Sequence, residues 1–144
     1  MTNTSALKTA IETAWETRDN AAAFDAATRA AIEDAVAHLG SGELRVAEPA
    51  ASGWQVNEWL KKAVLLYFRL HPNRVMDGGP MSAFDKVPLR FLDADKKQFN
   101  EAGMRVVPGA LVRRGAHVGK DAVLMPSYVN IGAYVGAGSM VDTW

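Results

Sequence analysis

The last forty residues of the chain, from Arg105 to Trp144, repeat with a period of six. Valines form two series joined by one five-residue step: Val106, Val112, Val118, and then Val123, Val129, Val135, Val141. Four positions after each of the first six valines comes a small residue: Ala110, Ala116, Ala122, Ser127, Ala133, Ser139. Each small residue directly follows a turn former: Gly109, Gly115, Asp121, Pro126, Gly132, Gly138. The valines, the turn formers and the small residues thus occupy three fixed positions of each six-residue unit. This pattern restricts the stretch to a solenoid of very short units.

A six-residue unit has room for one short strand and one tight corner, so one aliphatic side chain per unit can point inward. β-branched valine suits the extended segment. Glycine, and less readily aspartate, supplies the positive φ that a corner requires. Each coil of such a solenoid buries its inner face only against neighbouring coils. Residues 104–144 are therefore expected to form the start of a parallel β-helix.

The spacing resembles that of the hexapeptide-repeat acyltransferases, which implies a left-handed β-helix with three units per coil. Three segments, residues 104–108, 125–135 and 140–144, more narrowly resemble the tetrahydrodipicolinate N-succinyltransferases of lysine and diaminopimelate biosynthesis. Residues 44–48 and 59–66 resemble the same family. The resemblance implies a homotrimer with active sites between subunits. It also implies succinyl transfer from succinyl-CoA to the amine of ring-opened, hydrated tetrahydrodipicolinate, without a tightly bound cofactor.

The first 103 residues are expected to form a small, mostly helical α+β domain. Ser5 can cap a first helix with an apolar face, Leu7, Ala10, Ile11, Ala14 and Trp15. Further helices are expected over residues 25–39, with Gly40 as the stop, from Asn57 as cap to Leu70, and over 95–102, ended by Gly103. Residues 44–48 and 54–56 are expected as strands, 77–82 as a loop without a phosphate-binding pattern, and 84–91 as extended.

Composition excludes several classes of function. The chain has 16 basic and 16 acidic residues, which gives no electrostatic reason to expect a nucleic acid or a membrane surface as partner. It has no cysteine, and therefore neither a disulfide framework nor a thiol nucleophile. No basic and apolar leader opens the sequence, and no apolar run is long enough to span a membrane. A soluble cytoplasmic protein is expected.

Two residues match the family's functional positions. The resemblance implies that Arg105 binds substrate, and a guanidinium suits a dicarboxylate because it can fork onto a carboxylate. It implies that Asp142 contacts substrate and acts in catalysis, by orienting the amine and accepting its proton. The alternatives are a surface arginine at the open end of the solenoid and an ordinary polar turn residue. The family's second acidic residue and its coenzyme A contacts would lie beyond Trp144.

Other polar residues are weaker candidates. His38, His71 and His117 fall on a predicted helix, in a predicted loop and in the repeats, so a three-histidine metal site is not expected. His117 is expected to be a corner residue that faces solvent. Lys61 and Lys62 could meet a phosphate or a carboxylate, but a solvated helix face or a subunit contact is the preferred interpretation.

Trp144 lies a few residues into the seventh unit, after about two coils. Because an open coil exposes apolar side chains and strand edges, the sequence is expected to be the amino-terminal part of a longer enzyme, inactive by itself. The alternative is a short protein that caps itself by oligomerising. Two other functions stay open: a hexapeptide acyltransferase with another acceptor, and a non-catalytic trimeric solenoid.

Overall fold

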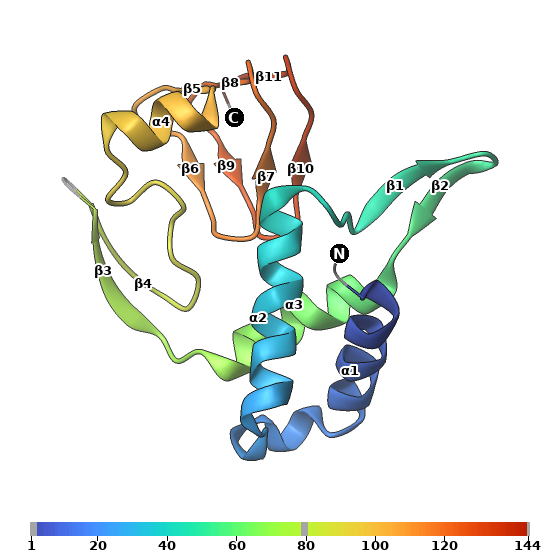
Figure 1. Cartoon of the computed structure of the whole chain (residues 1–144). Coiled ribbons are helices and arrows are strands. Elements are labelled where there is room, and N and C mark those ends of the chain that lie inside the picture. Colours follow the sequence, from blue (N-terminus) through green and yellow to red (C-terminus); the bar gives the residue numbers. More distant parts are fainter. Residues whose placement is uncertain (1–2, 79–80, 144) are drawn as a thin grey trace.

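The structure, a computed structural model, describes residues 3–78 and 81–143 (Figure 1). The helices are α1 (Thr4–Glu16), the 3-10 helix η1 (Arg18–Ala23), α2 (Ala26–Ser41), α3 (Glu58–Leu70) and α4 (Lys96–Ala102). Two hairpins separate them, β1 (Ala47–Ala50) with β2 (Gly53–Val56), and β3 (Arg74–Gly78) with β4 (Met81–Asp85). Seven two-residue strands follow: β5 (Arg105–Val106), β6 (Leu111–Val112), β7 (His117–Val118), β8 (Val123–Leu124), β9 (Tyr128–Val129), β10 (Tyr134–Val135) and β11 (Met140–Val141).

Helices α1, α2 and α3 pack against one another below the short strands, with α2 in the centre of the molecule (Figure 1). The predicted apolar face of α1 is confirmed, since Leu7, Ile11 and Ala14 are buried. The other large buried side chains of this core come mainly from α2 and α3: Ile32, Val36, Leu39, Trp59, Leu60, Leu66, Tyr67. Ile131 of the repeats belongs to the same core. The division into domains at residue 103 therefore stays a prediction.

The ends of the first two helices differ from the predicted ones. Asn3, rather than Ser5, caps α1, and its side-chain oxygen accepts a hydrogen bond from the N–H of Ala6 at 3.1 Å. Helix α2 runs through Gly40 to Ser41, and Gly42, which adopts φ +82°, is its C-cap. Gly40, within the helix, packs closely on the backbone of Gly115, whose Cα would lie 3.4 Å from a Cβ at Gly40.

Helix α3 has the predicted bounds, and Asn57 occupies the predicted N-cap position, although its side chain forms no capping bond. Its amide instead donates at 2.8 Å to the carbonyl of Arg45 and at 2.8 Å to Glu48 Oε1. Asn57 therefore ties the start of α3 to the chain entering the first hairpin. Helix α4 matches its prediction, with a capping box at Asp95 and a left-handed Gly103.

Both hairpins differ in part from expectation. The first begins at Ala47, three residues later than the predicted strand, and Ala47 pairs with Val56. The segment 77–82, expected as a loop, contributes the end of β3 and the start of β4, and only 79–80 lie outside the described residues. The cross-strand pair Val75 and Phe84 explains the hairpin, because β-branched and aromatic partners favour strands. Beyond Asp85 the predicted extended segment is irregular.

The strands from β5 to β11 form three short parallel sheets, β5–β8–β11, β6–β9 and β7–β10. Each strand thus pairs with the one three units later, as expected at the start of a parallel β-helix. Their inner side chains form a second core with buried Val112, Ala116, Val118, Ala122, Leu124 and Val129. The predicted corners are confirmed at Gly109, Gly115, Asp121, Gly132 and Gly138, all of which have positive φ. Residues 104–143 are called the repeat region below.

The predicted series of inward-facing valines is wrong at one unit. The buried side chain of the fourth unit is Leu124 at 0% exposure, not Val123. Val106 pairs with Leu124, and Val141 pairs with Leu124 on its other side. The five-residue step therefore lies between Leu124 and Val129, around Pro126, where the corner is one residue shorter. Both residues are aliphatic, so the spacing alone could not decide which one points inward.

Two neighbouring arginines join the repeat region to the rest of the chain. Arg113 donates through Nη2 to Asp85 at 2.5 Å and through Nη1 to Asn130 at 3.0 Å. Arg114 forms an ion pair with Glu33 of α2 at 2.7 Å, and also donates to the hydroxyl of Tyr67 at 3.1 Å. The contacts of Arg114, together with Gly40 against Gly115, fix α2 and α3 against the second corner of the repeats. None of the helices in residues 3–78 and 81–143 is long and apolar enough to cross a membrane.

Candidate functional site

The two predicted site residues lie on one face of the repeat region. Arg105 opens β5 and Asp142 directly follows β11, and both strands pair with β8 between them. Since neighbouring strands lie about 4.8 Å apart, β5 and β11 are roughly 10 Å apart. Within the described residues Arg105 and Asp142 form no ion pair with each other. The fold thus brings the two side chains to a common surface without direct contact.

Backbone hydrogen bonds of the sheet position Arg105. The N–H of Arg105 donates to the carbonyl of Ala122 at 2.9 Å. Two residues later, the N–H of Val107 donates to the carbonyl of Leu124 at 2.9 Å. Val106 faces the core, so Arg105 must face outward, and its side chain is exposed. None of the ion pairs of the described residues involves Arg105. The guanidinium is therefore available to an external carboxylate.

Asp142 is exposed and is held by a local turn. Its Oδ1 accepts a hydrogen bond from the backbone N–H of Thr143 at 2.8 Å. Upstream, the carbonyl of Val141 accepts from the N–H of Met125 at 2.9 Å, which fixes the strand that Asp142 leaves. An exposed carboxylate with a fixed orientation can accept a hydrogen bond, or a proton, from a cationic amine.

The protein surface between Arg105 and Asp142 is apolar. Arg105, Val123 and Met140 are aligned in register across β5, β8 and β11, with side chains on the outer surface. Met140 is 65% exposed, a high value for a large apolar side chain. A cation, a strip of aliphatic side chains and then a carboxylate follow one another along this face. Such a surface suits a molecule with an anionic end, an aliphatic middle and a cationic group.

The histidines lie apart and serve other contacts. His38 pairs with Glu43 at 2.5 Å, and His71 with Glu33 at 2.7 Å. The expectation of a solvent-facing corner for His117 is wrong, because it lies in β7, half-buried, with its ring 4.5 Å from that of Tyr134. Its other side meets the end of α2, where a Cβ at Gly42 would lie 2.5 Å from the imidazole. Among the described residues no three metal-ligating side chains come together.

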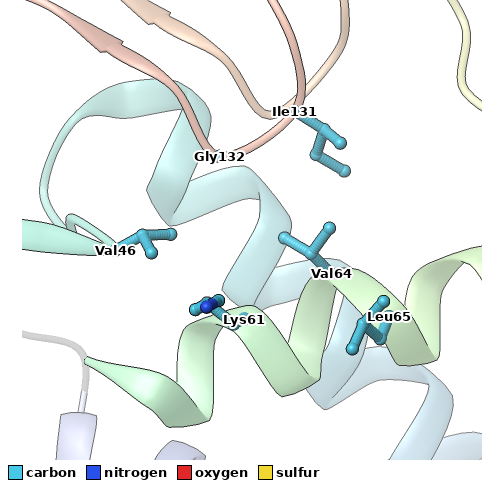
Figure 2. A pocket seen from close by; sticks show the side chains of 6 residues that line it. All are labelled: Val46, Lys61, Val64, Leu65, Ile131 and Gly132. Atoms are coloured by element: carbon cyan, nitrogen blue, oxygen red, sulfur yellow. The ribbon is translucent and has the colours of Figure 1, made fainter. Parts of the chain in front are cut away.

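The lysine pair of α3 divides into two roles. Lys62 forms an ion pair with Glu12 of α1 at 2.5 Å, a contact within the chain rather than the expected solvated face. Lys61 is exposed and borders a hollow between α3 and the corner at Gly132 (Figure 2). The sequence did not indicate this hollow, since its lining residues come from three separate segments. Only the spacing of Lys61, Val64 and Leu65, at positions i, i+3 and i+4 of α3, could have suggested that these three residues share a helix face.

Comparison with known proteins agrees with these observations. A family model described as "Tetrahydrodipicolinate N-succinyltransferase N-terminal" matches residues 6–70. The 2,3,4,5-tetrahydropyridine-2,6-dicarboxylate N-succinyltransferase of Caulobacter vibrioides is 54% identical over 144 residues, covering 96% of this chain and 52% of the relative. The enzymes of the same name from Methylorubrum extorquens and Idiomarina loihiensis are each 51% identical, covering 96% of this chain and 50% and 51% of their own length.

The chain thus spans about half the length of the curated relatives that it matches. The matched stretch includes nearly all of this chain, and so extends well beyond the helices covered by the family model. An identity above half over that many residues implies a shared fold and a common origin. The chain is therefore a homologue of the tetrahydrodipicolinate N-succinyltransferases.

Proposed function

We propose that the protein containing this chain transfers succinyl from succinyl-CoA to the amine of ring-opened tetrahydrodipicolinate, a step of lysine and diaminopimelate biosynthesis. The observation that carries the proposal is the outer face of β5, β8 and β11, where Arg105, an aliphatic strip and Asp142 follow one another. The acceptor has matching parts, because it carries carboxylates, a methylene chain and an amine. The relatives' shared name supports the same reaction.

Arg105 is proposed to bind a carboxylate of the acceptor. A guanidinium offers two parallel N–H donors to a carboxylate, which fixes the orientation of the substrate as well as its position. Charged hydrogen bonds of this type contribute about 1.5–3 kcal/mol. Loss of the guanidinium should therefore weaken acceptor binding by about 10- to 150-fold, with less effect on succinyl-CoA.

Asp142 is proposed to act on the reacting amine. The ammonium form has no lone pair, so it must lose a proton before its nitrogen can attack the thioester carbonyl. Asp142 would hold the ammonium group and accept this first proton, which leaves a neutral amine whose nitrogen attacks the thioester carbonyl. As the C–S bond then breaks, the thiolate of coenzyme A takes up the second proton that the nitrogen loses, an N-succinyl amide is released, and Asp142 returns the first proton to solvent. Bringing amine and thioester together supplies much of the acceleration, and no covalent enzyme intermediate is needed.

The assembly belongs to the same proposal. The short parallel sheets would continue a left-handed β-helix of hexapeptide units, and three copies would form a cytoplasmic homotrimer. Strands β5 and β11 are roughly 10 Å apart by strand spacing, and the site with Arg105 and Asp142 is proposed to be completed by groups from a neighbouring subunit. The coenzyme A contacts and a second acidic residue are proposed to come from the part of the relatives that this chain does not match.

A fusion protein with the missing part of a relative tests the proposal. The chain would be fused to the unmatched part of the Caulobacter vibrioides relative, and coenzyme A release would be followed with a thiol reagent. We expect acceptor-dependent release from the fusion and none from the 144-residue chain by itself. Release from the chain alone, or a folded, trimeric fusion that never releases coenzyme A, would refute the proposal.

Variants assign the two roles. Arg105→Met should raise the KM for the acceptor, and Asp142→Asn should lower kcat by about 10²- to 10⁴-fold, as expected for a group that takes a proton. Lys120→Met and Asp93→Asn, which alter exposed residues elsewhere, are matched controls and should leave both constants unchanged. An acyltransferase with another acceptor would instead show release with other amines only. A non-catalytic solenoid would form trimers and show no release.

A further inference from the structure

A hollow of about 280 Å³ lies beside α3 (Figure 2), and no residue of the β5–β8–β11 sheet is among those that line it. Helix α3 contributes Lys61, Val64 and Leu65, and the chain entering β1 contributes Val46. The corner between β9 and β10 closes it with Ile131 and Gly132. The helical part of the chain and the repeat region thus share one cavity.

The lining is aliphatic apart from one cation. Val46 and Val64 are half-buried and Ile131 is 8% exposed, whereas Leu65 at the rim is 50% exposed. Lys61 carries the single charge among the lining residues, and no ion pair of the described residues involves it. The neighbouring Lys62 differs, because it is paired with Glu12. An unpaired ammonium beside exposed aliphatic surface favours an anionic ligand with an apolar body.

The corner keeps the hollow open. Gly132 adopts φ +84°, which other residues rarely do, and a Cβ there would lie 3.4 Å from Val46 Cγ2 and 3.7 Å from Val64 Cγ2. A side chain at this position would occupy the upper end of the cavity. The left-handed glycine thus serves the turn and also leaves space between α3 and the repeats.

A second cation lies nearby. The guanidinium of Arg45, next to Val46 in the chain, stacks over the ring of Tyr134 at 3.6 Å. Arg45 donates to the Tyr134 hydroxyl at 2.6 Å, and none of the ion pairs of the described residues includes it. Its positive charge is therefore not neutralised by a carboxylate of the described residues. No carboxylate is among the residues that line the hollow.

We propose that this hollow binds a small carboxylate with a short apolar body, such as a medium-chain fatty acid or an aryl acid. The carboxylate pairs with Lys61, and the apolar body covers Leu65 and fills the space between Val46, Val64 and Ile131. Because the ligand contacts both α3 and the corner at Gly132, its binding holds the helical part of the chain to the repeat region. This site differs from the acceptor site in place, in lining and in ligand.

Hexanoate is a suitable probe, with hexanol and hexylamine as neutral and cationic counterparts of equal length. Titration of the 144-residue chain, followed by methyl NMR, should shift the signals of Val46, Val64, Leu65 and Ile131 with hexanoate. The ratio of folded to unfolded protein should rise about 11-fold at a hexanoate concentration ten times Kd. Hexylamine should have no such effect.

Reversal of the charge is the sharper test. Lys61→Glu should abolish the response to hexanoate and create one to hexylamine, since the aliphatic lining stays intact. Lys96→Glu, at an exposed position on α4, is the matched control and should behave as the unchanged protein. An equal response to hexanol, hexanoate binding that survives Lys61→Glu, or methyl shifts elsewhere would each overturn the proposal. Concentration-dependent shifts without ligand would overturn it in favour of a second copy of the chain.

Discussion

Replacement of Gly115 by alanine tests the contact that joins α2 to the repeats. Gly115 has φ +81°, and a Cβ there would lie 2.8 Å from Val36 Cγ1 and 2.9 Å from Ile131 Cγ1. Contacts below 3.0 Å force a neighbour to move. Val36 is 0% exposed and cannot move into solvent, whereas Ile131 borders the hollow beside α3. The substitution therefore adds steric overlap to backbone strain.

The two costs can be separated. Left-handed backbone costs a residue other than glycine about 1–2 kcal/mol, and overpacking a core costs about 1–3 kcal/mol. Gly115→Ala should thus lower the free energy of unfolding by about 2–5 kcal/mol. Gly109→Ala is the matched control, because Gly109 has φ +94° but its Cβ would meet only Pro126, at 3.5 Å. It should cost only about 1–2 kcal/mol.

Urea unfolding followed by circular dichroism measures the free energy of unfolding of both variants. Gly115→Ala should lose about 1–3 kcal/mol more than Gly109→Ala. In thermal unfolding, this difference corresponds to a Tm lower by roughly 2–12 °C for a chain of this size. Truncation of Val36 to alanine should partly relieve Gly115→Ala, so the double variant should be more stable than the sum of the single effects predicts. Equal losses for Gly115→Ala and Gly109→Ala would refute the packing of α2 on this corner.

Two further predictions concern the register of the repeats and the start of α2. Leu124→Ala should cost about 2–5 kcal/mol because Leu124 is fully buried, whereas Val123→Ala should cost less than about 1 kcal/mol; the reverse order in urea unfolding would contradict the register. The pKa of Asp25 is lowered because the backbone N–H and the hydroxyl of Thr28 donate to its carboxylate. Its contribution to stability is thus present above the unfolded-state pKa and is lost as pH falls through the folded-state value. Asp25→Asn, which caps without titrating, should show a smaller loss of stability below about pH 4, and an unchanged pH profile would refute this role.

The repeat region was largely predictable because its constraints are local. A corner of a six-residue unit needs positive φ, and glycine meets that need at Gly109, Gly115, Gly132 and Gly138. The inward column was harder to assign. Val123 and Leu124 are adjacent and both aliphatic, and only pairing with β5 and β11 shows which of them faces the core.

Helix ends depended on contacts that the sequence does not reveal. Asn3 and Ser5 can each cap a helix, and the choice between them shifts the boundary by only two residues. Gly40 and Gly42 lie two residues apart, and only the structure shows that Gly42 adopts the left-handed conformation that ends α2, whereas Gly40 packs on Gly115. His117 was misplaced for the same reason, since the end of α2 that covers it lies far away in the sequence.

The candidate site was predictable only through resemblance. Nothing in the spacing distinguishes Arg105 from other exposed arginines or Asp142 from an ordinary turn residue. The fold adds that both flank β8 on one outer face, separated by Val123 and Met140. Their roles in binding and proton transfer stay predictions. The hollow beside Lys61 could not be anticipated, because α3, Val46 and the corner at Gly132 meet only in the folded chain.

The most direct test compares two acceptors in the fused enzyme. The kcat/KM for coenzyme A release would be measured with the dicarboxylate amine and with an analogue that lacks one carboxylate, in the unchanged fusion and in Arg105→Met. If Arg105 binds that carboxylate, the variant should lose about 10- to 150-fold with the dicarboxylate and almost nothing with the analogue. The comparison would be made with two analogues, each lacking a different carboxylate. If Arg105→Met loses as much with both analogues as with the dicarboxylate, or loses nothing with any acceptor, the assignment of this face as the acceptor site is contradicted.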